Sequence, residues 1–176
     1  LDLGVELECN SRIGRDITLE DLRAQHQAVL VSIGAEKGRK LGVEGEEAGN
    51  VLSGVDLLSR INRGESVELG DKVVVVGGDN RALDAARACR RLGAEVTILF
   101  GDAEEQMPAM KRLVEDARAE GITLECLAAP VGFKKDGDRV TAVECIRMEL
   151  GDADEAGKRL PAPAVGSQFE IAVTAV

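Results

Sequence analysis

Residues 72–100 read KVVVVGGDNRALDAARACRRLGAEVTILF, and this stretch decides the fold class. The β-branched run at its start predicts a buried strand. A glycine turn follows at Gly77–Gly78, and small apolar residues then recur at helical spacing as far as Gly93, a residue type that commonly ends helices. Residues 95–100 are again mostly apolar and predict a second strand. A strand, a helix and a strand within about 30 residues predict a right-handed βαβ unit with parallel strands.

The residues after position 100 predict one more strand of this kind and then a different architecture. The pattern indicates a helix, a third strand, and two antiparallel strands joined by a tight Asp-Gly turn, followed by a polar excursion and a last strand. The ranges are 108–120, 122–126, 131–135, 139–149, 151–166 and 168–176. We therefore predict a three-layer, Rossmann-like α/β domain with a parallel sheet and an antiparallel β-meander crossover.

The residues before position 72 predict a separate, smaller part. They indicate short strands at 4–9 and 28–33, a helix at 18–25 with a capping box, a linker at 36–50, and a helix at 53–62 capped by Ser53 and Asp56. The run at 28–33 is continuously apolar, so we expect a strand buried on both faces.

Charge and composition exclude several classes of function. The chain has 22 Lys and Arg against 32 Asp and Glu, a net charge of −10, so nucleic acid and anionic membrane surfaces are not expected partners. No apolar run is long enough for a membrane span, and no secretory leader is visible. The four cysteines form no CxxC, so we expect buried thiols in a reducing, cytoplasmic setting and no metal site. The chain begins without Met and stops inside a predicted strand, so we expect it to be a piece of a longer protein.

The turn at residues 77–82 has the context that a dinucleotide fingerprint requires. A first glycine makes the tight turn, a second admits the pyrophosphate, and a last small residue lets helix and strand pack closely, while the phosphates rest on the helix N-terminus. The six positions are Gly77, Gly78, Asp79, Asn80, Arg81 and Ala82, so the first and last positions fit and the middle one holds an acid. The same residues also fit a turn without a ligand, in which Asp79 and Asn80 only cap the helix.

Residues 74–87, VVVGGDNRALDAAR, resemble the NADPH-domain fingerprint of the glutamate synthase small subunit and related flavoprotein subunits, which is close to GGGNVAMDAAR. Weaker similarities occur in the right order along nearly the whole chain. They are AVLVSIGA at 28–35, GNVLSGVDLLSRIN at 49–62, EQMPA at 105–109, IRMEL at 146–150, and the segment 161–169. The resemblance identifies the chain as similar to FAD/NAD(P)-dependent oxidoreductases of this family.

The resemblance implies a chemistry and a set of contacts. Enzymes of the family pass hydride from NADPH to FAD and then electrons to iron–sulfur centres or a partner subunit, while the protein aligns the two rings. Residues 77–82 would then hold the pyrophosphate, and Ser32, Gly34 and Ala35 would lie near the flavin–nicotinamide junction. The resemblance also implies a division into a remnant of the flavin-binding domain with its linker, 1–48, and a nucleotide-binding domain, 49–176. Association into a homo-oligomer is left open.

Departures from the family pattern predict a weakened site. Asp79 replaces the glycine that faces the pyrophosphate, and a carboxylate about 4 Å from a phosphate charge costs roughly 4 kcal/mol at an effective dielectric constant near 20. The family has Tyr-Arg-Arg after the second strand, where the arginines meet the 2′-phosphate of NADP. This chain has Phe100, Gly101 and Asp102 instead, and Arg81 is the candidate compensating cation. The flavin-binding GxGxxG is absent, so we do not expect this chain alone to hold FAD.

Three functions fit these observations. The first is a flavoprotein domain that binds NAD(P)H weakly or prefers NADH, because an acid near Asp102 can accept from a free ribose 2′-hydroxyl. The second is a degenerate, non-catalytic domain used for scaffolding or subunit assembly. The third is an unrelated small-ligand α/β domain. Saturable nucleotide binding separates the first from the second.

Overall fold

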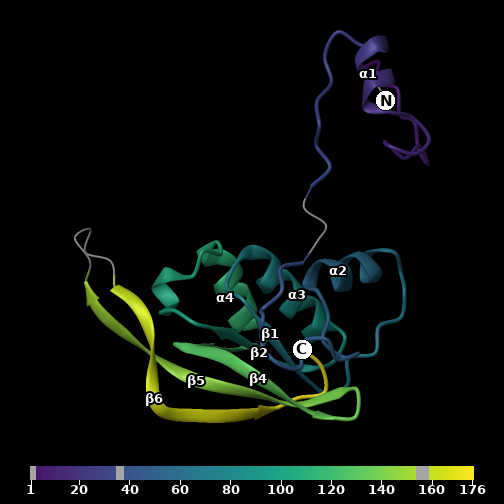
Figure 1. The fold of residues 1–176 in the computed structure, drawn as a ribbon. Helices are drawn as coiled ribbons and strands as arrows, with labels where there is room; N and C mark the ends of the chain where they lie inside the picture. The colour runs from purple at the N-terminus through teal and green to yellow at the C-terminus, as the bar shows by residue number, and fades with distance from the viewer. Residues whose placement is uncertain (1–2, 35–37, 154–158) are drawn as a thin grey trace. The chain divides into compact units, whose positions relative to one another are not determined.

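The computed structural model describes residues 3–34, 38–153 and 159–176, which fall into two compact units, Leu1–Ala35 and Glu36–Val176 (Figure 1). The units are described separately. The predicted domain division at 48/49 stays a prediction.

In the first unit, residues 3–34 contain one helix, α1, Leu19–Gln25. Its capping box is the predicted one, with the Thr18 hydroxyl accepting the Asp21 N–H and the Asp21 carboxylate accepting the Thr18 N–H. The two predicted strands at 4–9 and 28–33 are wrong, since neither segment joins a sheet. Leu30 is 92% exposed and Ile33 78% exposed. An apolar run becomes a buried strand only where neighbours pair its backbone, and the described residues supply none.

The second unit is built on a three-stranded parallel sheet in the order β1-β2-β3. Residues 80–91 and 104–119 connect the strands, as the predicted crossovers require, and a further helix precedes them. The elements are α2 (Gly54–Asn62), β1 (Lys72–Val76), α3 (Asn80–Arg91), β2 (Glu95–Phe100), η1 (Glu104–Gln106), α4 (Lys111–Ala119) and β3 (Thr123–Cys126). The predicted βαβ unit is confirmed, with β1 and β2 in parallel register.

An antiparallel sheet forms the third layer, in the order β4-β5-β6. The strands are β4 (Ala128–Asp136), β5 (Arg139–Ala153) and β6 (Arg159–Ala172). The predicted turn after Asp136 is present, with Gly137 at φ +60°. The predicted polar excursion at 151–166 is wrong for most of its length, because β5 and β6 stay paired as far as Ala153 and Arg159.

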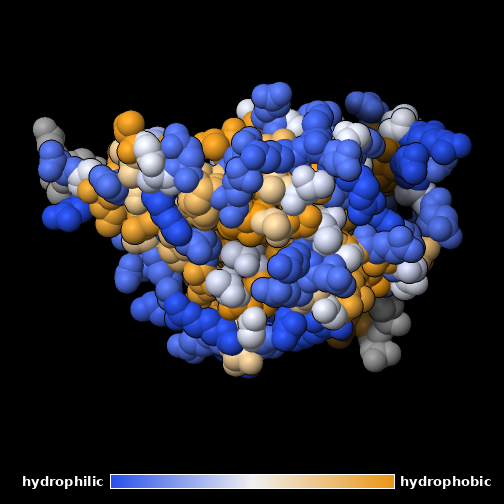
Figure 2. Space-filling view, turned by 90° about the horizontal axis from the view of Figure 1, so that it is seen from below, coloured by the Kyte–Doolittle hydropathy of each residue, from blue (hydrophilic) through white to orange (hydrophobic). Residues whose placement is uncertain are grey.

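Two prolines explain why the sequence did not predict the start of β6 as a strand paired with the end of β5. Pro161 pairs with Leu150 and Pro163 with Met148, although proline lacks the N–H that a central strand must donate. Among the described strands β6 pairs only with β5, so it is an edge strand and tolerates both prolines. Leu160 is 59% exposed and Val165 fully exposed. Figure 2 views the unit from the side of this sheet and shows hydrophobic residues interspersed among hydrophilic ones.

Strand alternation divides the core between the two faces of the parallel sheet. Val73, Val96 and Ile98 pack against the helices, whereas Val74 and Leu99 pack against the antiparallel sheet. Figure 1 shows the same arrangement, with α2, α3 and α4 on one side of β1 and β2, and β4, β5 and β6 on the other. The three-layer prediction is confirmed. Because both faces of the sheet are covered, its strands read as continuous apolar runs.

The last residues of the chain lie beside β1 and are joined there by the segment before α2. Ala175 forms a parallel bridge with Val73, and the Leu52 N–H donates to the Val176 carbonyl at 2.7 Å. Asn50 is the one polar residue among the buried ones described, at 7% exposure. Its Nδ2 donates to the carbonyls of Val140 and Thr174, both at 2.9 Å, and its Oδ1 accepts the Val140 N–H at 2.7 Å.

An ion-pair cluster joins the last turns of α3 and α4. Arg87 donates from Nη2 to Oε1 of Glu120 at 2.6 Å, and Nη2 of Arg91 donates to the same oxygen at 2.8 Å. Hydrogen bonds from Arg87 and then Arg91 hold the pKa of Glu120 below its usual value of 4.5. A lowered carboxyl pKa stabilises the folded state above pH 4.5, and that contribution is lost as the pH falls through the lowered pKa.

Glu120→Gln is therefore expected to flatten the acid side of the stability profile. Between about pH 5 and pH 3 the melting temperature of the variant should fall less steeply than that of the wild type, as followed by circular dichroism. Glu115→Gln, on the exposed face of α4, is the matched control and should keep the wild-type slope. Equal slopes for the wild type and Glu120→Gln would show that the cluster contributes nothing to the pH dependence.

Candidate functional site

The turn between β1 and α3 is held by close approach of its first and last residues. Gly77 has φ +140°, a region that favours glycine, and its N–H donates to the Leu99 carbonyl at 3.0 Å. A Cβ added at Gly77 would lie 3.1 Å from the Ala82 Cβ. The two positions that fit the fingerprint thus do what it requires: one makes the tight turn, and both let strand and helix pack closely.

Gly78 has a packing role that its place in the motif did not reveal. A Cβ at this position would lie 2.6 Å from ring atoms of Phe100 and 3.1 Å from Cγ of Met107. Its carbonyl accepts the Ala109 N–H at 3.0 Å. Gly78 therefore makes room for the end of β2 and ties the turn to the segment that leads into α4.

Asp79 is the N-cap of α3. Its backbone is extended, and Oδ1 accepts the Ala82 N–H at 2.9 Å. Nε of Arg81 lies 3.6 Å from Oδ2 of the same carboxylate. The N–H groups in the first turn of a helix have no intrahelical partner, and the Asp79 carboxylate accepts one of them, the Ala82 N–H. The N–H groups of Asn80 and Arg81 lie in the same turn.

Asn80 faces the neighbouring helix. Its Oδ1 accepts the Met110 N–H at 2.9 Å, and Met110 is the N-cap of α4. The Met110 N–H is one of the first N–H groups of α4, which have no intrahelical partner, and this bond supplies one. Asn80 therefore joins the amino ends of α3 and α4, the edge from which β1 and β2 present their carboxyl ends.

The residues after β2 line the same edge. Phe100 packs on Gly78, and the side chain of Asp102 accepts the Ala103 N–H at 2.8 Å. The Asp102 carbonyl accepts the N–H of Leu127 at 3.0 Å, and Leu127 has a left-handed backbone, φ +51°. A bulky residue in this region costs roughly 1–2 kcal/mol, so this connection to the meander is maintained against local strain.

The structure brings together most of the predicted site residues, but not all. Residues 77–82 and 100–102 meet at one edge of the parallel sheet. Ser32 and Gly34 are exposed in the first unit, and Ala35 lies outside the described residues. Their predicted place near a flavin therefore stays a prediction.

The cysteines differ in their surroundings. Cys89 and Cys145 are fully buried, and burial raises the pKa of each thiol to about 11. These two behave as small hydrophobic side chains, as predicted. Cys9 is exposed and Cys126 is only partly buried, so the prediction of four buried thiols is wrong for these two residues. Across residues 3–34, 38–153 and 159–176, no group of three or more His, Cys, Asp or Glu side chains is placed to hold a metal ion.

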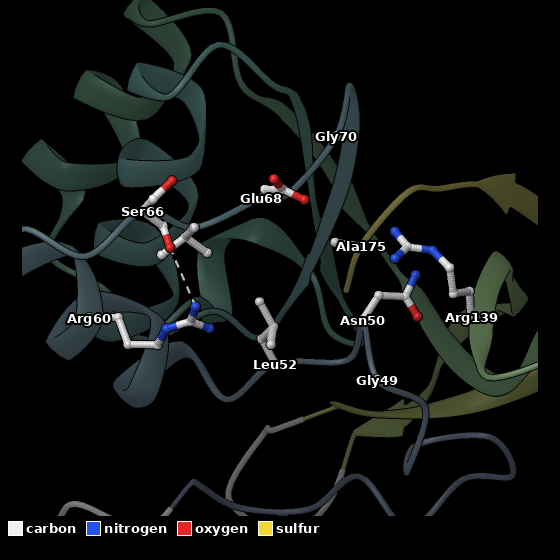
Figure 3. A pocket seen from close by; sticks show the side chains of 10 residues that line it. Gly49, Asn50, Leu52, Arg60, Ser66, Glu68, Gly70, Arg139 and Ala175 are labelled. Carbon is white, nitrogen blue, oxygen red and sulfur yellow. Dashed lines mark hydrogen bonds between the residues drawn. The ribbon is translucent and has the colours of Figure 1, made fainter.

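A cavity of about 710 Å³ lies at the opposite, amino edge of β1 (Figure 3). Asn50 and Arg139 line one side of it, and Arg60, whose guanidinium reaches the Ser66 carbonyl, lines another. None of the predicted site residues lines this cavity. Sequence reasoning gave no weight to Asn50, because its partners Val140 and Thr174 are distant in sequence and no local pattern signals them.

Comparison with known proteins identifies the family. The family model described as pyridine nucleotide-disulphide oxidoreductase matches residues 6–167. This chain belongs to that family.

Within the described part of the chain, no helix is long and apolar enough to cross a membrane.

Relatives within the family include the proteins suggested by the sequence motifs. The chain is 40% identical over 174 residues to "NADPH-Fe(3+) oxidoreductase subunit beta" of Geobacter sulfurreducens, covering 96% of this chain and 26% of that protein. It is 37% identical over 183 residues to "Glutamate synthase [NADPH] small chain" of Azospirillum brasilense, covering 97% and 38%. The predicted resemblance is confirmed, and the chain spans between a quarter and two fifths of these relatives.

Solved structures confirm the fold of this pyridine nucleotide-disulphide oxidoreductase domain. Mycobacterium tuberculosis FprA in complex with NADPH matches with a TM-score of 0.72 at 18% identity, over 93% of this chain and 52% of that one. Thioredoxin reductase from T. acidophilum matches with a TM-score of 0.56 at 19% identity, over 79% of this chain and 39% of that one. Both are reductases with the Rossmann-like fold.

Proposed function

We propose that this chain is the NAD(P)H-binding domain of a flavin-dependent pyridine-nucleotide oxidoreductase similar to the glutamate synthase small subunit. The observation that carries the proposal is the close-packed Gly77–Ala82 turn at the carboxyl edge of β1. The chain that contains this turn belongs to the pyridine nucleotide-disulphide oxidoreductase family. Open α/β sheets bind ligands at this edge. The parent protein would hold FAD and pass electrons to an iron–sulfur or other partner subunit in the cytoplasm. Residues 1–48 would belong to its flavin-binding part and 49–176 to the nucleotide domain.

The described residues fit a dinucleotide in part. Gly77 and Ala82 provide the close approach of strand and helix, and the amino end of α3 provides N–H groups and a positive dipole. When bound, NAD(P)H supplies a hydride, which FAD accepts in the parent protein. This chain's contribution is to bind the phosphates and fix the orientation of the ligand. Since Asp79 already occupies the Ala82 N–H, we expect weak binding.

The residues after β2 favour NADH over NADPH. The carboxylate of Asp102 stands at the end of β2, where this fold places an acid that accepts from a ribose 2′-hydroxyl. A 2′-phosphate at that place would meet a like charge rather than the arginines of the family pattern. The expected preference is about tenfold, which corresponds to about 1.4 kcal/mol.

Isothermal titration of the 176-residue chain with NADH, NADPH and ADP tests the proposal. We expect saturable binding of all three, tightest for NADH among the two dinucleotides, and loss of the preference in Asp102→Asn. Tighter binding of NADPH than NADH would contradict the assignment of Asp102.

A second candidate function is a degenerate domain that serves scaffolding or subunit assembly. One observation favours it: Asp79 caps α3 as a residue of a ligand-free turn would. This function predicts no heat when the wild type is titrated with any of the three nucleotides.

A further inference from the structure

The amino end of α3 carries an anion and a cation of its own. The Asp79 carboxylate accepts the Ala82 N–H through one oxygen, and the Arg81 guanidinium lies beside the other at 3.6 Å. The side chains of Arg81 and Asp79 are 60% and 51% exposed, respectively. Neither is held by burial, so each can turn away without opening the core.

A phosphate at this turn would use these same two partners. Phosphates at helix amino ends accept first-turn N–H groups, and arginine is the side chain best suited to pair with their oxygens. The carboxylate of Asp79 thus stands where a phosphate oxygen would stand. The Ala82 N–H donates to one of these anions at a time, so a phosphate that takes this N–H requires release of the Asp79 carboxylate.

We propose that a dinucleotide diphosphate binds here by exchange, in which it displaces the Asp79 carboxylate from the Ala82 N–H and takes over Arg81 as its own partner. This inference rests on the proposed function, because it assigns the regulation of that nucleotide site. Asp79 lowers the affinity for the diphosphate, and Arg81 raises it. The Asp79 carboxylate therefore competes with the ligand, and a ligand with little negative charge does not displace it.

The exchange gives Arg81 a role that differs from simple neutralisation of Asp79. If Arg81 contacts the phosphate, its removal weakens binding whether or not residue 79 is acidic. If it only neutralises Asp79, its removal has no effect once the acid is gone. A double-mutant cycle separates the two roles.

The cycle uses the 176-residue chain as wild type, Asp79→Ser, Arg81→Ala and the double variant, each titrated with ADP and with adenosine. Serine keeps the N-cap without the charge, and Asp79→Asn is the second variant if the serine protein does not fold. We expect Asp79→Ser to tighten ADP binding at least tenfold. Arg81→Ala should weaken it about tenfold in both backgrounds, while the affinity for adenosine stays unchanged. Arg139→Ala, which removes the same charge at the amino edge of β1, should leave ADP binding unchanged.

Three results would overturn the exchange alone: no gain of ADP affinity in Asp79→Ser, no effect of Arg81→Ala, or an effect of Arg81→Ala that disappears in the double variant. Absence of ADP binding by all four folded proteins, with Asp79→Ser included, would instead overturn the proposed nucleotide function and the exchange that rests on it.

Discussion

Asn50→Asp is expected to destabilise the second unit by about 3–5 kcal/mol, because it leaves a buried charge without a suitable partner. In the wild type, Nδ2 of Asn50 donates to the carbonyls of Val140 and Thr174. Aspartate has the same shape but no N–H, so a carboxylate oxygen would face two carbonyl oxygens inside the fold. Urea denaturation at neutral pH, followed by circular dichroism, measures the loss in free energy of unfolding.

Asn62→Asp is the matched control for this change. Asn62 is the exposed last residue of α2, where the same substitution adds a charge in water near a helix carboxyl end. Its expected cost is below about 1 kcal/mol. Equal losses in free energy of unfolding for the two variants would mean that the side-chain hydrogen bonds of Asn50 do not stabilise the second unit.

Leu83→Ala is expected to lower the free energy of unfolding by about 2–5 kcal/mol, since it opens a cavity in the core between α3 and the parallel sheet. Leu83 is fully buried. Domains of this kind have only about 5–15 kcal/mol of net stability, so a loss of this size removes a large share of it. The same denaturation experiment measures the change.

Leu92→Ala provides the comparison on the same helix. Leu92 is the C-cap of α3 and is 53% exposed, so most of its side chain is already in water. We expect a loss below about 1 kcal/mol. A loss as large as that of Leu83→Ala would contradict the assignment of the core to the sheet-facing side of α3.

The elements predicted from the sequence are those whose causes lie close together in the chain. The β-branched run at 72–76, the glycine turn and the small residues of α3 each favour the same local structure, and β1-α3-β2 formed as predicted. The wrong predictions concern segments whose structure depends on pairing with strands that are distant in sequence. The run at 28–33 has no strand to pair with in the described residues, while the proline-containing start of β6 is held in a strand by β5.

The candidate site shows the same division. The close approach of Gly77 and Ala82 follows from the motif, and capping by Asp79 was one of the two interpretations left open. Ser53 is the N-cap residue of α2, as predicted, but its side chain makes no hydrogen bond to the first turn of the helix. The packing of Gly78 against Phe100 was not predicted, because it depends on how β2 and the segment before α4 meet in space.

The position of Thr174 has a consequence for the order in which the fold can form. Thr174 bonds to Lys72, 102 residues earlier, and to Asn50, 124 residues earlier. Translation at about 5–20 residues per second separates the synthesis of β1 from that of Thr174 by roughly 5–20 seconds. During that interval β1 can pair with β2, but its opposite edge has no neighbour. Loops of this length also slow closure, since their entropy is lost before the contact is gained. The edge of β1 is therefore a surface of the nascent chain that stays uncovered until Thr174 and Ala175 have been synthesised.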